Sequence, residues 1–442
     1  MKTFYFVLLC CLTAQISLSQ DLYIPIDTSN FLLRKTKSAE YLDRAKLFSK
    51  EIKEQYSGKE KSYISDQFDE MHKAFNNELL AGDYVFDARF DQMINKVVAE
   101  LKAKNPVIPQ NLTFYISKEP ALNAANMGDR CFVVNMGTFY FLDNEEQLAA
   151  VLSHELGHLL LNNVIKSMQR SLAVDKTESK QQLKDIRRSE KNKSEKALKS
   201  FKNLLYAESN IRKMEEFEAD SVGYILYRNT AYVKNDYLSA MELMAMYDSV
   251  KPIGLSIDIY KNVFDLPNQP FKEDWLKRED FSAYDYTKYK EKIDKDSIQS
   301  HPEMAERIAR LKRIFPDLNN ANADSTKASK EFEALSRIAQ LEQMPNFDYS
   351  EDYGLGIYLC LLHIQNNDWI DYYKSWLGKF FQKIYTARKE YKLNRYLDRI
   401  APKDQSESYQ QFLSFMWNLN PAEIKNIADY YTEKKQSATA FQ

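Results

Sequence analysis

The chain of 442 residues contains only four cysteines, and two of them, Cys10 and Cys11, lie near its start. The other two, Cys131 and Cys360, permit one disulfide at most and form no CxxC metal or redox pair. A cysteine framework therefore cannot hold this fold together. The hydrophobic content of 44% instead predicts a large buried core, with room for two or three domains.

An excess of charge of one sign is also missing. The 61 basic and 63 acidic residues give a formal charge of −2, and basic and aromatic residues do not interleave as in RNA-binding proteins. We therefore expect no nucleic-acid partner. Apolar runs such as 132–142 and 355–362 are too short for a spanning helix, so we expect no integral membrane segment in the mature chain. Peripheral association with a membrane stays open.

The first residues have the order of a secretory signal peptide. A basic start precedes a short apolar run at 4–12 and a small, polar tail at 13–20, and we expect cleavage near Ser19 or Gln20. A membrane anchor is the alternative, although the run is short for a bilayer. A lipoprotein signal is disfavoured because neither early cysteine follows a small residue. We therefore expect an exported protein, periplasmic or secreted.

Histidine is scarce as well, yet two of the five histidines stand in the run His154-Glu155-Leu156-Gly157-His158. Residues four apart share one face of a helix, so both imidazoles can bind one zinc ion while Glu155 stands beside a bound water. With so few histidines, such an HExxH run rarely arises by chance. The apolar residues on both sides of the run also favour a metal site. They predict a half-buried helix, whose two histidines and glutamate need a partner, and a metal ion would supply it.

Local patterns predict a mainly α fold with a small β-sheet in front of the motif helix. The charged, heptad-like stretch 38–80 and the amphipathic stretch 90–102 read as helices, and 112–116 and 131–134 read as strands. Acidic and capping residues just before the motif predict a helix that begins near Glu145. The HExxH run then lies inside this helix.

Breaks in composition and pattern divide the chain into a signal peptide at 1–19, an N-terminal helical segment at 20–82, a domain at 83–315 that contains the HExxH run, and a C-terminal helical domain at 316–442. Within the domain at 83–315, the charged insertion 170–205 reads as a solvated helical arm or a mobile insertion. The last region is rich in Tyr, Phe and Trp. We interpret these aromatic stripes as core between helices rather than as a ligand cage.

A catalytic zinc usually has three protein ligands, so a third must come from elsewhere in the chain. The best candidate is Glu216, inside an apparent helix at 211–227. Asp220 lies one turn further on and can accept a hydrogen bond from a ligand histidine. The alternative is that these acids decorate a solvent-facing helix. The small residues Ala219 and Gly223 favour a packed helix that approaches the motif helix closely.

Three segments together resemble the HtpX and CAAX prenyl protease family of zinc metallopeptidases, which are gluzincins. They are Leu148 to His158, Glu216 to Gly223, and Ser300-His301-Pro302 with the following Glu306-Arg307-Ile308. The resemblance covers about 83–315. It implies an α+β zincin-like metalloprotease core, to which the C-terminal helical domain is added. Integral members of the family have spanning helices and this chain has none, so processing of prenylated proteins is disfavoured.

The resemblance also implies a role for each matching residue. His154, His158 and Glu216 bind one zinc ion, Glu155 is the general base, and Asp220 orients a ligand histidine. Zinc itself is an expectation from the ligand types, because other divalent ions can occupy such sites.

His301 matches a family histidine near the open metal position, where it stabilises the oxyanion or acts as a fourth ligand in a resting form. Asn123 and Asn126 lie in a stretch that resembles the family's substrate-side strand, and Arg307 completes the predicted substrate-binding set. We expect substrate to lie extended along this strand, held by main-chain hydrogen bonds.

These residues predict a zinc-dependent endopeptidase that acts on unfolded or misassembled exported proteins, with Glu155 moving a proton from water to the leaving nitrogen. The rival hypothesis is a largely latent zinc-binding chaperone or assembly factor that binds protein partners through its C-terminal helical domain. A metal-free structural protein is a third, weaker hypothesis.

Overall fold

The computed structural model of the chain describes residues 23–176, 193–249, 254–278, 303–319, 326–401 and 405–439. Most of this part is helical, with one small mixed sheet and a C-terminal helical region, which confirms the predicted fold class. The predicted signal peptide and residues 177–192 of the charged insertion lie outside the described residues.

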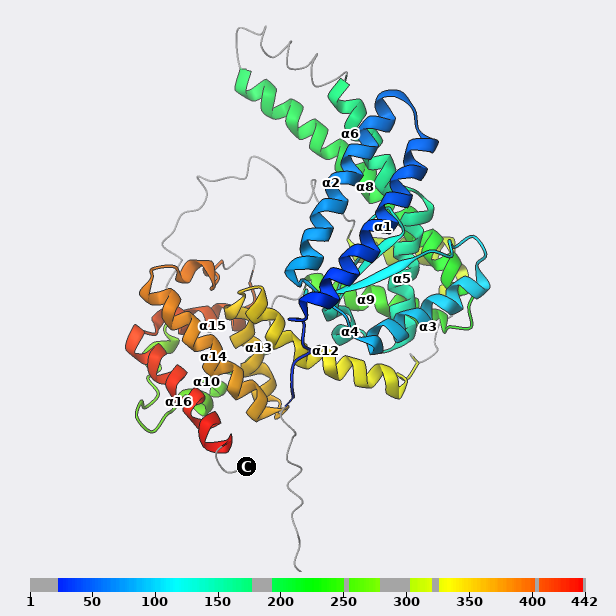
Figure 1. The fold of residues 1–442 in the computed structure, drawn as a ribbon. Coiled ribbons are helices and arrows are strands. Elements are labelled where there is room, and N and C mark those ends of the chain that lie inside the picture. Colours follow the sequence, from blue (N-terminus) through cyan, green and yellow to red (C-terminus); the bar gives the residue numbers. More distant parts are fainter. Residues whose placement is uncertain are drawn as a thin grey trace, which may run out of the picture.

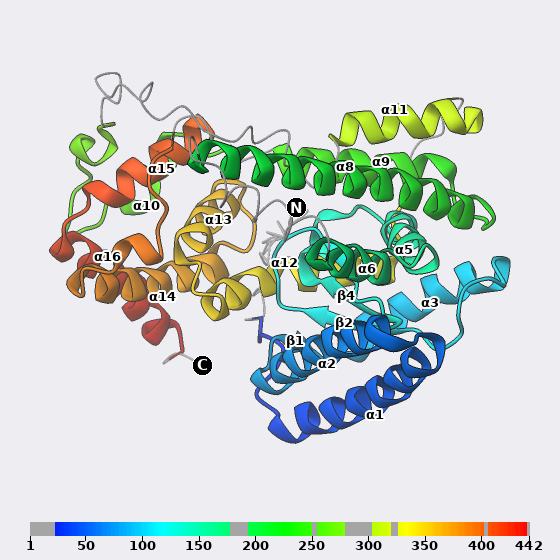
Figure 2. The same ribbon diagram turned by 90° about the horizontal axis from the view of Figure 1, so that it is seen from above.

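Two helices, α1 (Phe31–Gln55) and α2 (Gly58–Ala81), form the N-terminal segment. Apolar side chains recur at helical spacing on α1, from Tyr41 to Phe48 and Ile52, and are buried against α2. The chain then leaves α2 at Gly82, whose φ of 97° is the left-handed conformation that glycine adopts readily. The pair covers one side of the sheet, as Figure 2 shows.

The sheet has the strand order β1-β2-β4-β3. Its strands are β1 (Tyr84–Val85), β2 (Thr113–Ser117), β3 (Ala124–Asn126) and β4 (Cys131–Asn135). β2 and β4 run parallel. Within the described residues β3 pairs only with β4, in antiparallel direction, so β3 is an edge strand. The helix α3 (Ala88–Lys104) lies between β1 and β2 in sequence. It buries its apolar face in a core that it shares with the sheet. The two strands predicted from the sequence match β2 and β4 closely.

The motif helix α5 (Glu145–Leu160) follows the short helix α4 (Met136–Phe141). Asn144 caps it, since the Asn144 side chain accepts a hydrogen bond of 2.9 Å from the Gln147 N–H. Two glutamates in the first turn suit the positive end of the helix dipole. The predicted start near Glu145 is therefore confirmed.

The long helix α8 (Lys193–Arg228) packs against α5 at very short range. A Cβ atom on Gly157 would lie 2.6 Å from the Ala219 carbonyl oxygen, and one on Gly223 would lie 2.9 Å from His154 Cα. Only glycine fits at these two positions. The two glycines thus allow the motif face of α5 and the acidic face of α8 to lie side by side.

The remaining helices surround these elements or form the C-terminal region. They are α6 (Asn163–Lys176), α9 (Lys234–Ser249), α10 (Asp258–Phe264), α11 (Met304–Ile314), α12 (Lys330–Tyr349), α13 (Tyr353–Gln365), α14 (Ile370–Lys389), α15 (Glu407–Asn418) and α16 (Pro421–Thr439), with 3-10 turns at Glu273–Leu276, Pro316–Leu318 and Leu393–Arg395.

Two large hydrophobic cores lie side by side, and α12 contributes to both (Figure 1). Its first half, including Phe332, packs on the core around α5, and its second half, including Met344, packs in the C-terminal core. Ile259 and Trp275, which fall within the predicted protease domain at 83–315, also pack in the C-terminal core. The C-terminal core therefore does not begin at the predicted domain border at residue 316. The chain first enters this core, then returns to the core around α5, and later enters the C-terminal core again.

The C-terminal core contains many Tyr, Phe and Trp side chains beside aliphatic ones, so the aromatic stripes of this region are buried between helices. Cys131 and Cys360 are free and buried in different clusters, and no disulfide joins them.

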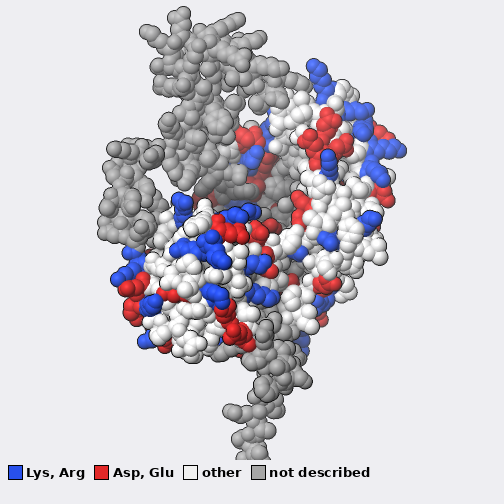
Figure 3. All heavy atoms as spheres, turned by 60° about the vertical axis from the view of Figure 1, so that its left-hand side comes forward, with Lys and Arg blue, Asp and Glu red and all other residues white. Residues whose placement is uncertain are grey.

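Figure 3 shows one face of the molecule, on which Lys and Arg lie interspersed with Asp and Glu in small groups. That face presents no broad surface of one charge. Within the described residues, no helix combines the length and the apolar character that crossing a membrane requires.

The crossing of α5 and α8 predicts the effect of Gly157→Ala. Alanine normally favours a helix by about 1 kcal/mol over glycine. Here the added methyl group meets the α8 backbone, and we expect a loss of about 1–3 kcal/mol in the free energy of unfolding. Thermal unfolding measures it, with Glu218→Ala on the exposed face of α8 as control. A Gly157→Ala protein as stable as the wild type would contradict the close crossing.

Candidate metal centre

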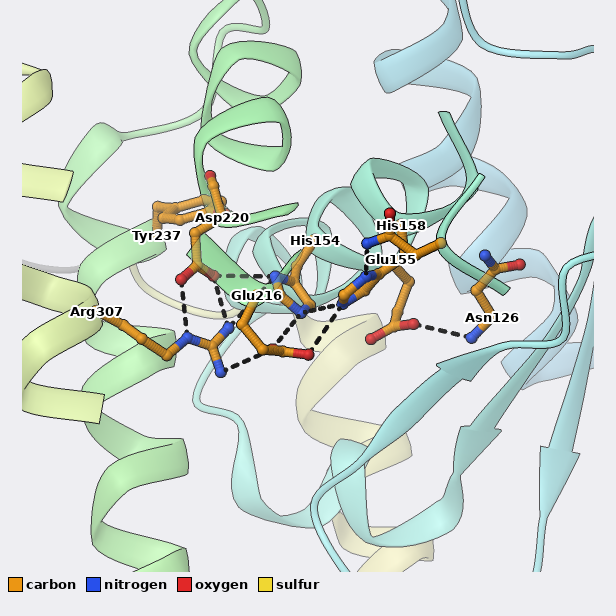
Figure 4. A network of polar contacts seen from close by, with 9 residues as sticks. Asn126, His154, Glu155, His158, Glu216, Asp220, Tyr237 and Arg307 are labelled. Carbon is orange, nitrogen blue, oxygen red and sulfur yellow. Dashed lines mark hydrogen bonds and ion pairs between the residues drawn. The ribbon is translucent and has the colours of Figure 1, made fainter. Parts of the chain in front are cut away.

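Three side chains from α5 and α8 converge on one point (Figure 4). The Nε2 atoms of His154 and His158 lie 3.1 Å apart, and the Glu216 carboxylate lies 3.5 Å from the first and 3.4 Å from the second. Ligands about 2.0–2.2 Å from a common tetrahedral ion stand roughly 3.3 Å from one another. The two nitrogens and the carboxylate thus have both the chemistry and the spacing of a catalytic zinc site. Each of the three residues offers one ligand atom to the ion.

The triad contacts a buried network of ionic side chains. His154 Nδ1 lies 3.0 Å from Asp220, which was predicted to orient a ligand histidine. A hydrogen on Nδ1 directed at Asp220 leaves the Nε2 lone pair facing the metal position. Arg307 on α11 donates to both oxygens of Asp220, at 2.8 and 2.6 Å, and lies 3.2 Å from Glu216.

Arg307 was predicted to bind substrate. It borders the cleft at this site, is 4% exposed, and pairs through its guanidinium with Asp220 and Glu216. These contacts hold the Glu216 carboxylate of the triad and the Asp220 carboxylate that lies against His154. The other residue predicted from the same segment, His301, lies outside the described residues.

Glu155 lies beside the triad, on the side of the edge strand. Its Oε2 accepts a hydrogen bond of 2.8 Å from the Asn126 backbone N–H. Burial is the main cause that raises the pKa of Glu155 above its usual value, and a raised pKa favours a carboxylate that accepts a proton from water. Asn123 and Asn126 line the same cleft, which encloses about 820 Å³.

Comparison with known protein families agrees with this geometry. The model of peptidase family M48 matches residues 86–315, more than half of the chain. This chain belongs to peptidase family M48. The family consists of zinc metallopeptidases of the HtpX and Ste24 type, so the resemblance predicted from the sequence is confirmed, and His154, His158 and Glu216 form the metal-binding triad. No curated protein matches the chain.

Charge in this M48 site is arranged to receive a cation. Although burial lowers it, hydrogen bonds to Asp220 and Glu216 raise the pKa of His154 to about 10. Burial also raises the pKa of Asp220, but hydrogen bonds with Arg307 and His154 outweigh this and bring that pKa below its usual value. The carboxylates therefore stabilise positive charge at the place where a metal ion would bind.

Asn163, the first residue of α6, is a site residue that the sequence did not reveal. Its side-chain nitrogen lies 2.8 Å from His158 Nδ1, and its side-chain oxygen is buried without a partner. A histidine that binds metal through Nε2 carries a hydrogen on Nδ1 and needs an acceptor there. Turning the amide by 180° places the oxygen at this position, where it accepts a hydrogen bond from the His158 Nδ1–H. An asparagine five residues after His158 was the only sequence signal.

Replacing Asn163 tests this assignment. We expect Asn163→Leu to weaken zinc binding by about 10–100-fold, because His158 loses the acceptor that fixes its ring. Asn163→Asp is the matched control: it keeps the size and the acceptor, and we expect it to bind zinc nearly as well as the wild type. Competition with a chromophoric chelator measures both. Equal affinities in the leucine variant and the wild type would show that Asn163 does not orient His158.

Proposed function

We propose that this M48 peptidase is a zinc-dependent endopeptidase that hydrolyses peptide bonds of unfolded or misassembled exported proteins. The observation that carries the proposal is the position of β3, a strand with one free edge, beside Glu155 and the metal triad. The predicted signal peptide supports export to the periplasm or the outside of the cell.

On the side of β3 that faces away from β4, main-chain groups other than the Asn126 N–H, which donates to Glu155, can pair with an extended polypeptide. Asn123 and Met127 bond to β4, since the Asn123 carbonyl accepts from Asn135 and the Met127 N–H donates to Cys131. Backbone groups alternate in direction along an antiparallel strand, so those of Ala124 and Asn126 face the opposite way. The bond from Asn126 to Glu155 agrees with this direction.

A substrate that adds to this edge needs an extended backbone and little sequence specificity, because main-chain hydrogen bonds do not read side chains. Folded proteins rarely expose such segments, whereas unfolded chains do. This supports unfolded polypeptides as the substrate class.

The side chains divide the chemical work. Zinc, when bound to His154, His158 and Glu216, supplies Lewis acidity toward the scissile carbonyl and the attacking water. Glu155 takes the proton of that water and passes it to the leaving nitrogen. Asp220 and Arg307 keep the ligands in place and remain outside the proton transfer.

A second candidate function is a largely latent chaperone or assembly factor that acts through the C-terminal helices. It is favoured by the separate C-terminal core, of which no residue lines the described cleft. In that case the C-terminal region binds protein partners while the metal site rarely turns over.

Glu155→Gln separates the two candidates. The substitution keeps the shape of the side chain but removes the base, and we expect cleavage of an unfolded protein such as casein to fall by about 10²–10⁴-fold while zinc stays bound. Glu218→Gln, an exposed change on α8, is the control and should retain activity. A wild-type protein that binds zinc and unfolded chains but cleaves none would favour the chaperone instead.

A further inference from the structure

A small recess opens off the cleft beside Glu155. β3, α5 and α9 form its walls, with Ala124, Val151, Ala240, Met241 and Met244 among the residues that line it. Ala124, Ala240 and Met241 are buried in the core around α5. The recess therefore lies next to the predicted general base and continues from the edge strand on which a substrate would lie.

Three polar residues that line this recess, Tyr237, Asp220 and Arg307, are already paired with one another. The Tyr237 hydroxyl donates to the Asp220 carbonyl at 3.1 Å, and Arg307 pairs with the Asp220 carboxylate (Figure 4). Apart from His154, Glu155 and Tyr237, the lining from α5 and α9 consists of alanine, valine and methionine. A polar or charged ligand group would lose its hydration there without a new partner. The recess thus fits an apolar group.

The free space is small, about 20 Å³. About 10–15 Å³ on this measure holds one water molecule. As it stands, the recess accepts a group of roughly methyl size, and a branched or aromatic side chain would require its lining to move.

Met244 is the apolar α9 side chain that borders both cavities. It is half-buried and borders both the recess and the cleft, whereas Met241 is 5% exposed and borders only the recess. A methionine side chain is unbranched and rotates about three bonds, so its position can adapt more easily than that of the buried residues behind it. Among the apolar α9 side chains of the recess, Met244 is therefore the one that can adapt most easily to an entering group.

We propose that this recess is the specificity pocket for one residue flanking the scissile bond, that it selects an alanine-sized apolar side chain, and that Met244 sets the size limit. The inference rests on the proposed endopeptidase function. Successive side chains of an extended substrate point to opposite faces, so the residue in the pocket is read while its neighbours face away. The enzyme then combines broad choice of polypeptide with selection at one position.

The test is cleavage-site mapping by mass spectrometry on an unfolded protein, followed by kcat/KM on peptides that differ at the mapped position. One additional methylene in an apolar pocket changes kcat/KM by about 10–200-fold, so we expect the wild type to prefer Ala over Leu by at least tenfold. Met244→Ala should narrow this preference or reverse it. Met244→Phe should sharpen the restriction to Gly and Ala.

Met246→Ala is the matched control, since Met246 lies on the same helix but is 55% exposed and does not line the recess. It should keep the wild-type preference. Cleavage of unfolded protein with no size preference, or an unchanged profile in both Met244 variants, would overturn the pocket but leave the endopeptidase proposal standing. A wild-type protein that cleaves no substrate would overturn both.

Discussion

The close crossing of α5 and α8 is the constraint on which the metal centre depends. Gly157 and Gly223 let the two backbones approach to a distance at which any larger residue would meet main-chain atoms. Each helix alone presents an incomplete set, two imidazoles on α5 and two carboxylates on α8. The crossing brings the Glu216 carboxylate within 3.5 Å of both imidazoles, and the cleft, the edge strand and the general base are arranged around that point.

Buried charge gives the second constraint. Glu155, Glu216 and Asp220 are all nearly buried, and an unpaired charge in such a place is strongly destabilising. Arg307 compensates two of the three carboxylates directly. A divalent cation at the triad would complete the compensation. The metal is therefore expected to stabilise the fold as well as to support catalysis, which links metal binding to folding.

The sequence predicted what depends on local patterns. The capping residue Asn144 and the four-residue spacing of the histidines predicted α5. The one-turn spacing of Glu216 and Asp220 predicted the acidic face of α8. Other contacts between distant segments were not visible. Arg307 donates a hydrogen bond to Asp220, which lies 87 residues earlier in the sequence. No local sequence pattern indicates that Trp275 packs in the C-terminal core. Asn163 was missed because its contact with His158 depends on how the chain turns between α5 and α6.

The account depends most directly on three side chains sharing one ion, and X-ray absorption at the zinc edge of the full chain measures this. The structure predicts one zinc per chain with nitrogen and oxygen neighbours at about 2.0–2.2 Å, two of them imidazoles, and no sulfur. Removing His158 should lower the imidazole contribution. Sulfur scattering at about 2.3 Å, or a spectrum that does not change in His158→Ala and Glu216→Ala proteins, would contradict the account.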